Sequence, residues 1–198
     1  VEGVISDFEV TEEMLAYLIG KAEKMSPKTF RPRVVVGVPS GITNVEHRAV
    51  YDAAISAGAR EVYIIEEPMA GAIGIDLPVL DPVGCMVVDI GGGTTDIAVM
   101  SLGGIVQSRS IKLAGDKMNQ DVIDYLRNEY KILVGEKTAE EIKVAVGSVQ
   151  SKSEGLEISV RGRDLISGLP REIMITDRDI YEAIHNSVQT IIDGIRSS

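Results

Sequence analysis

The pattern of apolar and polar positions predicts a chain in which short strands alternate with amphipathic helices. Arg33 to Val38 and Val62 to Ile65 contain continuous apolar runs, which are typical of strands buried on both faces. Between them, Thr43-Asn44-Val45-Glu46 has the spacing of a helix-capping box, and Gly58 has the position of a C-terminal cap. A strand, a helix and a strand joined by short links predict a parallel βαβ unit with a right-handed crossover.

Helical spacing also marks the beginning, the middle and the end of the chain. Thr11 has the position of the N-cap of a packed helix, and another helix is predicted to open at Gly115. Residues 135–147 predict a small helix, in which Thr138-Ala139-Glu140-Glu141 has the spacing of a second capping box. The last helix is predicted to begin near Thr176, and it carries a strong apolar stripe that is typical of core packing.

Strand-like segments follow the βαβ unit and surround the most informative stretch of the chain. Residues 85–88 and 97–100 are apolar runs on either side of D-I-G-G-G-T-T-D (89–96), which predicts a β-hairpin. Residues 105–113 are expected to continue as a third strand. Further along, residues 156–160 and 173–175 predict a second pair of strands of hairpin type.

The turn of the first hairpin, Gly91-Gly92-Gly93, has the composition of a phosphate-binding turn. Residues without a Cβ let backbone N–H groups approach a ligand, and successive N–H groups form an anion-binding concavity. Thr94 and Thr95 add hydroxyl donors, and Asp89 at the mouth of the turn has the position to hold a hydrated Mg²⁺. The alternative is a plain hairpin loop, but an unpaired carboxylate at the end of a buried strand is costly.

Two other phosphate-binding motifs are excluded. The sequence contains no G-x-x-x-x-G-K-[ST], so it has no P-loop. A strand-like run rather than a helix follows the glycines, which excludes the dinucleotide-binding fingerprint as well.

Glu67 lies where parallel α/β sheets collect their ligands, directly after the second predicted strand and before Pro68. A carboxylate at this place could orient a water molecule and accept its proton. The alternative is that Glu66 and Glu67 are ordinary acidic residues at a helix start, where the helix dipole favours anions.

Composition narrows the class of protein without naming a function. Of the 198 residues, 44% are hydrophobic and 25% are charged, which are ordinary values for a globular protein. The net charge of −10 argues against nucleic acid as a partner, because phosphate backbones are bound by basic surfaces. The single cysteine, Cys85, cannot form an internal disulfide, which favours a reducing compartment. Neither a membrane-spanning run nor a signal peptide is seen in the sequence.

The stretch V-V-D-I-G-G-G-T-T-D (87–96) resembles the second phosphate motif of the actin, sugar kinase and heat-shock chaperone superfamily. Other segments resemble one bacterial actin family, MreB, and occur in that family's order. These segments are P-R-V-V-V-G-V-P-S-G-I-T (32–43), I-E-E-P-M-A (65–70), S-L-G-G-I-V (101–106), I-K-L-A-G-D (111–116), G-E-K-T-A-E-E-I-K (135–143) and D-L-I-S-G-L-P (164–170). Together they cover nearly the whole chain, so it is identified as a member of this family.

The resemblance implies an α/β fold of the actin-like ATPase (ribonuclease H-like) class, present in part, with a small α+β insert. It implies that residues 1–82 are the rear part of the first actin-like subdomain and 83–130 the start of the second. Residues 131–178 would then be the small insert, and 179–198 a helix that returns to the second subdomain. The family's first phosphate hairpin and its downstream G-G-G adenine motif are not among these residues. We therefore expect residues 1–198 alone to be marginally stable, to bind ATP weakly or not at all, and to lack measurable ATPase activity.

The same resemblance implies ATP and Mg²⁺ as ligands and suggests which residues hold them. Asp89 would be the metal carboxylate, and Glu67 matches the family's water-positioning residue. Gly115 and Asp116 could face the nucleotide sugar or phosphates, although Asp116 could equally be a simple N-cap. The implied phosphate-binding residues are Gly91, Gly92, Gly93, Thr94 and Thr95. Glu140, Lys143 and, with weaker support, Glu141 match the segment that holds adenosine and ribose; a surface ion pair is the alternative for Glu140 and Lys143.

The role implied by the resemblance is that of a filament-forming protein that guides cell-wall synthesis and maintains rod shape. Its partners would be further copies of itself, the inner membrane surface and cell-wall elongation proteins, and it would be cytoplasmic at the inner face of the plasma membrane. Phe30 matches a membrane-dipping loop of the family only in part, since its neighbour is Thr29; packing of Phe30 in the core is the alternative. Rival functions are a chaperone-type ATPase, a sugar or acetate kinase, and a structural protein without a nucleotide.

Overall fold

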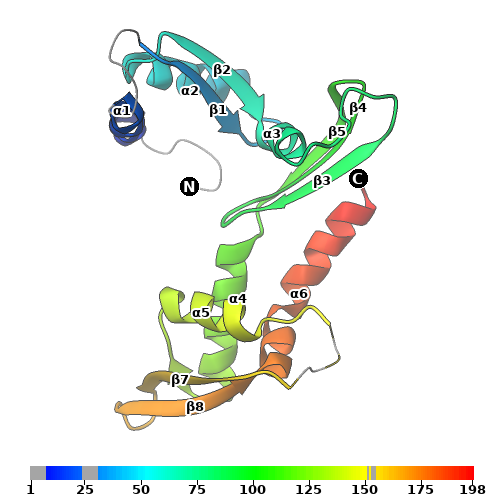
Figure 1. Cartoon of the computed structure of the whole chain (residues 1–198). Helices are drawn as coiled ribbons and strands as arrows, with labels where there is room; N and C mark the ends of the chain where they lie inside the picture. Colours follow the sequence, from blue (N-terminus) through cyan, green and yellow to red (C-terminus); the bar gives the residue numbers. More distant parts are fainter. Residues whose placement is uncertain (1–7, 24–30, 151, 153–154) are drawn as a thin grey trace. The chain divides into compact units, whose positions relative to one another are not determined.

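The structure is a computed structural model that describes residues 8–23, 31–150, 152 and 155–198 (Figure 1). The predicted membrane-loop residue Phe30 lies outside these ranges. The chain divides into two compact units. The first unit contains the described residues up to Ile90, residues 94–112 and Ser198, and the second contains Gly91–Gly93 and Leu113–Ser197. Each unit has a hydrophobic core of its own.

The first unit opens with the predicted βαβ arrangement. Its first elements are α1 (Phe8–Glu23), β1 (Arg33–Val38), α2 (Asn44–Ser56) and β2 (Glu61–Glu66). β1 and β2 pair in parallel, as expected. The capping box of α2 is confirmed, because Thr43 Oγ1 accepts a hydrogen bond from the N–H of Glu46 at 3.2 Å and Glu46 Oε2 accepts one from the N–H of Thr43 at 2.7 Å. Gly58 has φ +110°, which is the left-handed conformation expected after a helix end.

Two predictions for this region are wrong. The helix α1 begins at Phe8, so Thr11 lies inside the first turn and does not cap it. The strands β1 and β2 are not buried on both faces, since Val35 is 66% exposed and its register partner Tyr63 is 53% exposed. One face of this two-stranded sheet has no covering element among the described residues, and local sequence does not reveal how many faces of a strand are covered.

The second sheet of the first unit is the predicted hairpin with its third strand. After α3 (Glu67–Gly74) come β3 (Cys85–Ile90), β4 (Thr95–Ser101) and β5 (Gly104–Ile111). The three strands form one antiparallel sheet in the order β3-β4-β5. α3 packs against β3 and β4. The buried core cluster of this region consists of Ala72 of α3, Val79 in the loop after α3, and Ala98 and Met100 of β4.

The second unit is a small antiparallel sheet with three helices. Its elements are α4 (Gly115–Glu129), β6 (Ile132–Leu133), α5 (Glu136–Val146), β7 (Glu157–Asp164), β8 (Pro170–Thr176) and α6 (Asp177–Arg196). The predicted pairing of β7 with β8 is confirmed, while β6 was not predicted. The core joins Leu126 of α4, Ile142 of α5, Ile175 of β8 and Ile180 of α6, all of which are at most 1% exposed. Burying each such side chain stabilises the fold by about 1.5–3 kcal/mol.

The helix predicted over residues 135–147 is confirmed as α5, but the capping box predicted at Thr138 is wrong. Gly135 is its N-cap, so Thr138 lies within the helix instead of capping it. The helix extends further towards the N-terminus than the box predicted, because Glu136 and Lys137 are good helix formers.

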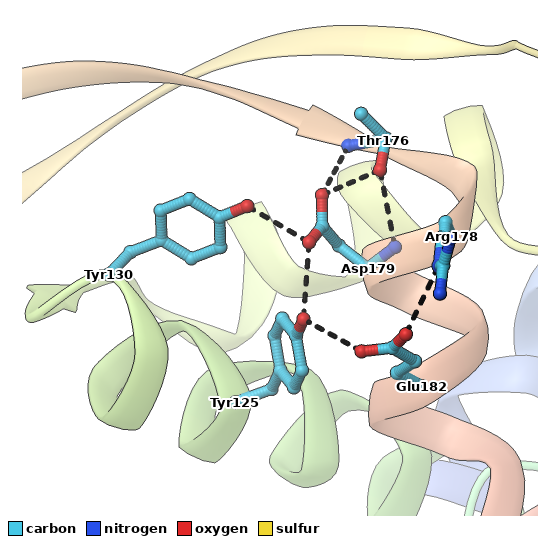
Figure 2. A network of polar contacts seen from close by, with 6 residues as sticks. All are labelled: Tyr125, Tyr130, Thr176, Arg178, Asp179 and Glu182. Carbon is cyan, nitrogen blue, oxygen red and sulfur yellow. Dashed lines mark hydrogen bonds and ion pairs between the residues drawn. The ribbon is translucent and has the colours of Figure 1, made fainter.

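A polar cluster links α4 to the start of α6, and we call it the Asp179 cluster (Figure 2). Asp179 Oδ1 accepts hydrogen bonds from the hydroxyls of Tyr130 at 2.9 Å and Tyr125 at 3.1 Å. Asp179 Oδ2 accepts from the backbone N–H of Thr176 at 2.9 Å and from its hydroxyl at 2.6 Å. The Tyr125 hydroxyl also lies 3.4 Å from Glu182 Oε2. The same carboxylate therefore takes part in the capping box of α6 and holds Tyr125 of α4 and Tyr130, the C-cap residue of α4.

Candidate functional site

The hairpin β3–β4 places two carboxylates directly opposite each other. Asp89 near the end of β3 is the register partner of Asp96 near the start of β4. Like charges directly opposite on neighbouring strands destabilise a sheet. Asp89 is exposed, whereas Asp96 is only 2% exposed, and its Oδ1 has no hydrogen-bond partner among the described residues. A buried, unsatisfied carboxylate oxygen costs stability, and such groups concentrate at functional sites.

Glu67 completes this group, and we call Glu67, Asp89 and Asp96 the acidic cluster. Glu67 is the first residue of α3 and follows β2 directly. Burial first, and then the negative charges of Asp96 and Asp89, raise the pKa of the Glu67 carboxyl above its ordinary value. Gly37 of β1 leaves space for this side chain, because a Cβ there would lie 3.3 Å from Glu67 Cγ.

The acidic cluster has donor chemistry that suits a hydrated Mg²⁺. Magnesium is usually bound through one or two carboxylates and keeps several of its waters. Within the described residues, no three His, Cys, Asp or Glu side chains converge as a chelating set. Asp89 is the exposed carboxylate of the cluster and could reach a metal ion. Asp96, its register partner, has a carboxylate oxygen without a hydrogen-bond partner among the described residues, so its negative charge is not balanced there. The residues therefore fit a metal held through a single carboxylate and water.

The glycine turn belongs to the second unit, where it is hydrogen-bonded to the start of α4. The Gly91 carbonyl accepts from the N–H of Gly115 at 3.1 Å, and the Gly92 carbonyl accepts from the N–H of Asp116 at 2.8 Å. A Cβ on Gly92 would lie 3.2 Å from Asp116 Oδ2, so a side chain there requires the carboxylate to move. None of the three turn glycines has a left-handed φ. Glycine at position 92 is thus explained by the closeness of the Asp116 carboxylate, and not by a backbone conformation that only glycine adopts easily.

Asp116 does not cap α4. The N-cap is Ala114 and makes no side-chain capping bond, so Asp116 is the second residue of the helix with an exposed carboxylate. Of the two threonines after the turn, Thr94 is partly exposed, whereas Thr95 lies in β4 with no exposed surface. The Thr95 hydroxyl is therefore inside the fold, and the hydroxyl available at the turn is that of Thr94.

The predicted pair on α5 is tied to α4 through Lys143. Its Nζ lies 2.7 Å from Glu140 Oε2 and 3.2 Å from the carbonyl oxygen of Gly115. Asn119 of α4 donates from Nδ2 to the same Glu140 oxygen at 2.8 Å. The Lys143 side chain is 17% exposed, so this is not an ordinary surface pair. The hydrogen bonds from Lys143 and Asn119 lower the pKa of Glu140. Glu141 points elsewhere and pairs with Lys137 at 4.0 Å.

Two residues of this arrangement were not predicted as site residues. Asp96 could have been found from the hairpin pairing, because it stands two residues after the loop 91–94 and Asp89 stands two residues before it. Asn119 follows Gly115 by one helical turn on α4, a spacing that places the two on one face of the helix. The sequence alone does not show that α5 packs at that face.

Comparison with known proteins decides the family. A family model described as MreB/Mbl protein matches residues 1–198. The chain belongs to the MreB/Mbl family. The cell shape-determining protein Mbl of Bacillus subtilis (strain 168) is 47% identical over 195 residues, which cover 98% of this chain and 58% of that protein. The chain thus spans somewhat more than half the length of this MreB/Mbl relative.

Solved structures confirm the α/β, actin-like ATPase fold. The crystal structure of MreB 5 of Spiroplasma citri bound to AMPPNP has a TM-score of 0.91 and 38% identity, and covers 100% of this chain and 59% of that one. The MamK double helical filament has a TM-score of 0.79 at 22% identity, and covers 99% of this chain and 59% of that one. At that identity, MamK supports the fold alone. No described helix of this MreB/Mbl chain combines the length and apolar character that a membrane span requires.

Proposed function

We propose that this chain is the nucleotide-binding part of a filament-forming ATPase that directs cell-wall synthesis and maintains rod shape. The observation that carries the proposal is the acidic cluster, whose Asp89 and Asp96 flank the glycine turn in the sequence, in a chain of the MreB/Mbl family. The relative bound to AMPPNP supports a nucleotide as ligand. A chaperone-type ATPase is not favoured, because the similar Bacillus protein is a cell shape-determining protein.

In this proposal the phosphates lie at the turn Gly91–Gly93, where backbone N–H groups and the Thr94 hydroxyl donate to them. Asp89 would hold a hydrated Mg²⁺, which neutralises phosphate charge when bound. Lys143 holds the Glu140 carboxylate at the start of α4, so that Glu140 can accept hydrogen bonds from ribose hydroxyls.

Glu67 acts on the attacking water. The water oxygen forms a bond to the terminal phosphorus as the bond from that phosphorus to the leaving ADP oxygen breaks. The proton released by the water goes to the Glu67 carboxylate. Because its pKa is raised, Glu67 accepts that proton more readily than an ordinary carboxylate does. Hydrolysis would then alter filament stability, and the filament would lie at the inner face of the plasma membrane with cell-wall elongation proteins as partners.

Two variants of the full-length protein test this proposal. Asp89→Ala should weaken Mg²⁺-ATP binding in a calorimetric titration, because the metal loses its carboxylate. Glu67→Ala should bind Mg²⁺-ATP nearly as well as wild type but release phosphate on the order of 10²-fold more slowly. Asp193→Ala is the matched control, since Asp193 is an exposed carboxylate on α6. Unchanged affinity in Asp89→Ala, together with unchanged phosphate release in Glu67→Ala, would rule the proposal out.

A further inference from the structure

Asn119, in the second turn of α4, is a buried polar residue whose amide is only half satisfied. It is 9% exposed, and its Nδ2 donates to Glu140 Oε2 at 2.8 Å. Its Oδ1 is buried and has no hydrogen-bond partner among the described residues. Buried amides normally use both ends, because an acceptor removed from water without a partner lowers stability. Packing of α4 alone therefore does not explain an asparagine at this position.

The orientation of the Asn119 amide is set by Glu140. The hydrogen bonds from Lys143 and Asn119 lower the pKa of Glu140, so this carboxyl is an anion near neutral pH and attracts donors. If the amide were turned around, its oxygen would face a carboxylate oxygen, and two acceptors would repel each other. The amide nitrogen is thus committed to Glu140, and the amide oxygen is left unpaired as a result.

Two helices hold one oxygen of Glu140 and leave the other free. Oε2 accepts from Asn119 of α4 and, at 2.7 Å, from Lys143 Nζ of α5. Within the described part of the chain, Oε1 accepts no hydrogen bond, and the Glu140 side chain is 49% exposed. The carboxylate is therefore fixed through Oε2, and Oε1 is available to a ligand.

Lys143 has a donor to spare at the same place. An ammonium group carries three N–H donors. Among the described residues, its hydrogen-bond partners are two, Glu140 Oε2 and, at 3.2 Å, the carbonyl oxygen of Gly115. A Cβ at Gly115 would lie 3.3 Å from Lys143 Nζ, so glycine leaves room for the ammonium. One N–H of Lys143 is thus left for a ligand.

The free acceptor and the free donor together match two neighbouring hydroxyls. A hydroxyl both donates and accepts hydrogen bonds. One hydroxyl of a sugar diol can donate to Glu140 Oε1 while the next accepts from Lys143. A site that hydrogen-bonds a hydroxyl discriminates against an analogue that lacks it, because a polar group of the site is then left unpaired. The arrangement therefore suits ribose better than 2′-deoxyribose.

We propose that Asn119 is a positioning residue that makes this site select ribose over 2′-deoxyribose, by holding Glu140 with Oε1 presented to the sugar. Without the Asn119 amide, the Glu140 carboxylate is free to rotate toward the ammonium of Lys143 and no longer presents Oε1. The inference rests on the proposed nucleotide function and adds to it a residue and a sugar specificity.

Calorimetric titrations of the full-length protein with Mg²⁺-ATP and with Mg²⁺-2′-deoxy-ATP test the inference. We expect wild type to bind ATP about tenfold or more tightly than 2′-deoxy-ATP, as for the loss of one hydrogen bond to a charged group. Asn119→Ala should reduce this preference to about threefold or less. The change should come mainly from weaker binding of ATP, because 2′-deoxy-ATP already lacks one of the two hydroxyls.

Asn119→Asp takes the place of Asn119→Ala if thermal melts show that the alanine variant does not fold. It keeps the size of the side chain but replaces the donor to Glu140 with an acceptor, so it should lose the preference as well. Asn128→Ala is the matched control, since Asn128 lies on the same helix with an exposed side chain. It should keep the wild-type preference.

The ratio of the two affinities separates positioning from a merely structural role. If Asn119 only joins α4 to α5, its replacement weakens or abolishes binding of both nucleotides alike, and either result would overturn the inference. Equal affinity of wild type for ATP and 2′-deoxy-ATP would overturn it too, while leaving the proposed function intact. If wild type binds neither nucleotide, the proposed function fails together with this inference.

Discussion

At the scale of single residues, the acidic cluster combines features that do not favour stability. Asp89 and Asp96 face each other across two paired strands, and Glu67 is partly buried beside them. Among the described residues, Asp96 Oδ1 has no hydrogen-bond partner. Residues that conflict with stability in this way are typical of sites selected for chemistry.

Glu67→Gln should therefore change stability in a pH-dependent way. The pKa of Glu67 is raised above its ordinary value of 4.5, so the folded state binds more protons than the unfolded state as Glu67 titrates. Stability is then lost as pH rises through this range. We expect Glu67→Gln to melt at a higher temperature than wild type at about pH 7, and the difference to shrink at about pH 4. Thermal melts provide the measurement. If the melting temperatures of Glu67→Gln and wild type differ by the same amount at both pH values, the pKa of Glu67 is not raised by burial and by its acidic neighbours.

The positions of Asp89 near the end of β3 and of Glu67 directly after β2 were predictable from the sequence, because apolar runs mark where these strands end; their roles stay predictions. The sequence could not show that Thr95 is fully buried. Side chains of a strand point alternately to its two faces, and which face is covered depends on the rest of the chain. The sequence also could not show the contact of Asn119 with Glu140, because that contact depends on how two helices pack.

At the scale of elements, two segments with the same capping spacing behave differently. Thr43 caps α2, but Thr138 lies inside α5. The residues before Thr43 are Gly41 and Ile42, after a proline turn, so the helix cannot easily extend backwards. Glu136 and Lys137 before Thr138 favour helix, so α5 begins earlier. A capping motif therefore fixes a helix start only where the preceding residues resist the helix.

Asp179→Asn should destabilise the second unit. Burial alone would raise the pKa of Asp179, but hydrogen bonds from Thr176, Tyr130 and Tyr125 outweigh it and lower the pKa. We expect a loss of about 1–3 kcal/mol near neutral pH, as for a hydrogen-bonded charged group. This contribution is fully present above the unfolded value of 3.8 and is lost as pH falls through the lower folded pKa.

Urea unfolding at neutral and acid pH measures this effect. Asp193→Asn on the exposed side of α6 is the control and should change little. A loss for Asp179→Asn that is as large at about pH 2 as at neutral pH would mean that the ionised carboxylate is not the cause.

At the scale of the whole molecule, the two units differ in the cores that hold them. The core of the second unit is built from large aliphatic side chains on α4, α5, α6 and its sheet. The buried residues of the first unit's core cluster are Ala72, Val79, Ala98 and Met100, two of them alanines. Val35 and Tyr63 leave a face of its parallel sheet exposed. Buried apolar area sets most of the stability of a unit, so the second unit should be the more stable one.

Native-state hydrogen exchange should show this difference. We expect amides in α4 and α6 to exchange more slowly than amides in α1, β1 and α2, because opening the second unit exposes more apolar surface. Uniform protection across both units would mean that they unfold as one. The alternation of strands and helices was predictable from periodicity, but this difference was not, since core size depends on contacts far apart in the sequence.

The Asp179 cluster has one more consequence, and it is optical. The chain contains no tryptophan and six tyrosines, so its ultraviolet emission comes from tyrosine. Two of the six, Tyr125 and Tyr130, donate their hydroxyl protons to one carboxylate. An excited phenol passes its proton to such an acceptor and loses its emission. We therefore expect these two rings to emit weakly in the folded second unit and more strongly once α6 separates from α4, so tyrosine fluorescence should report that event.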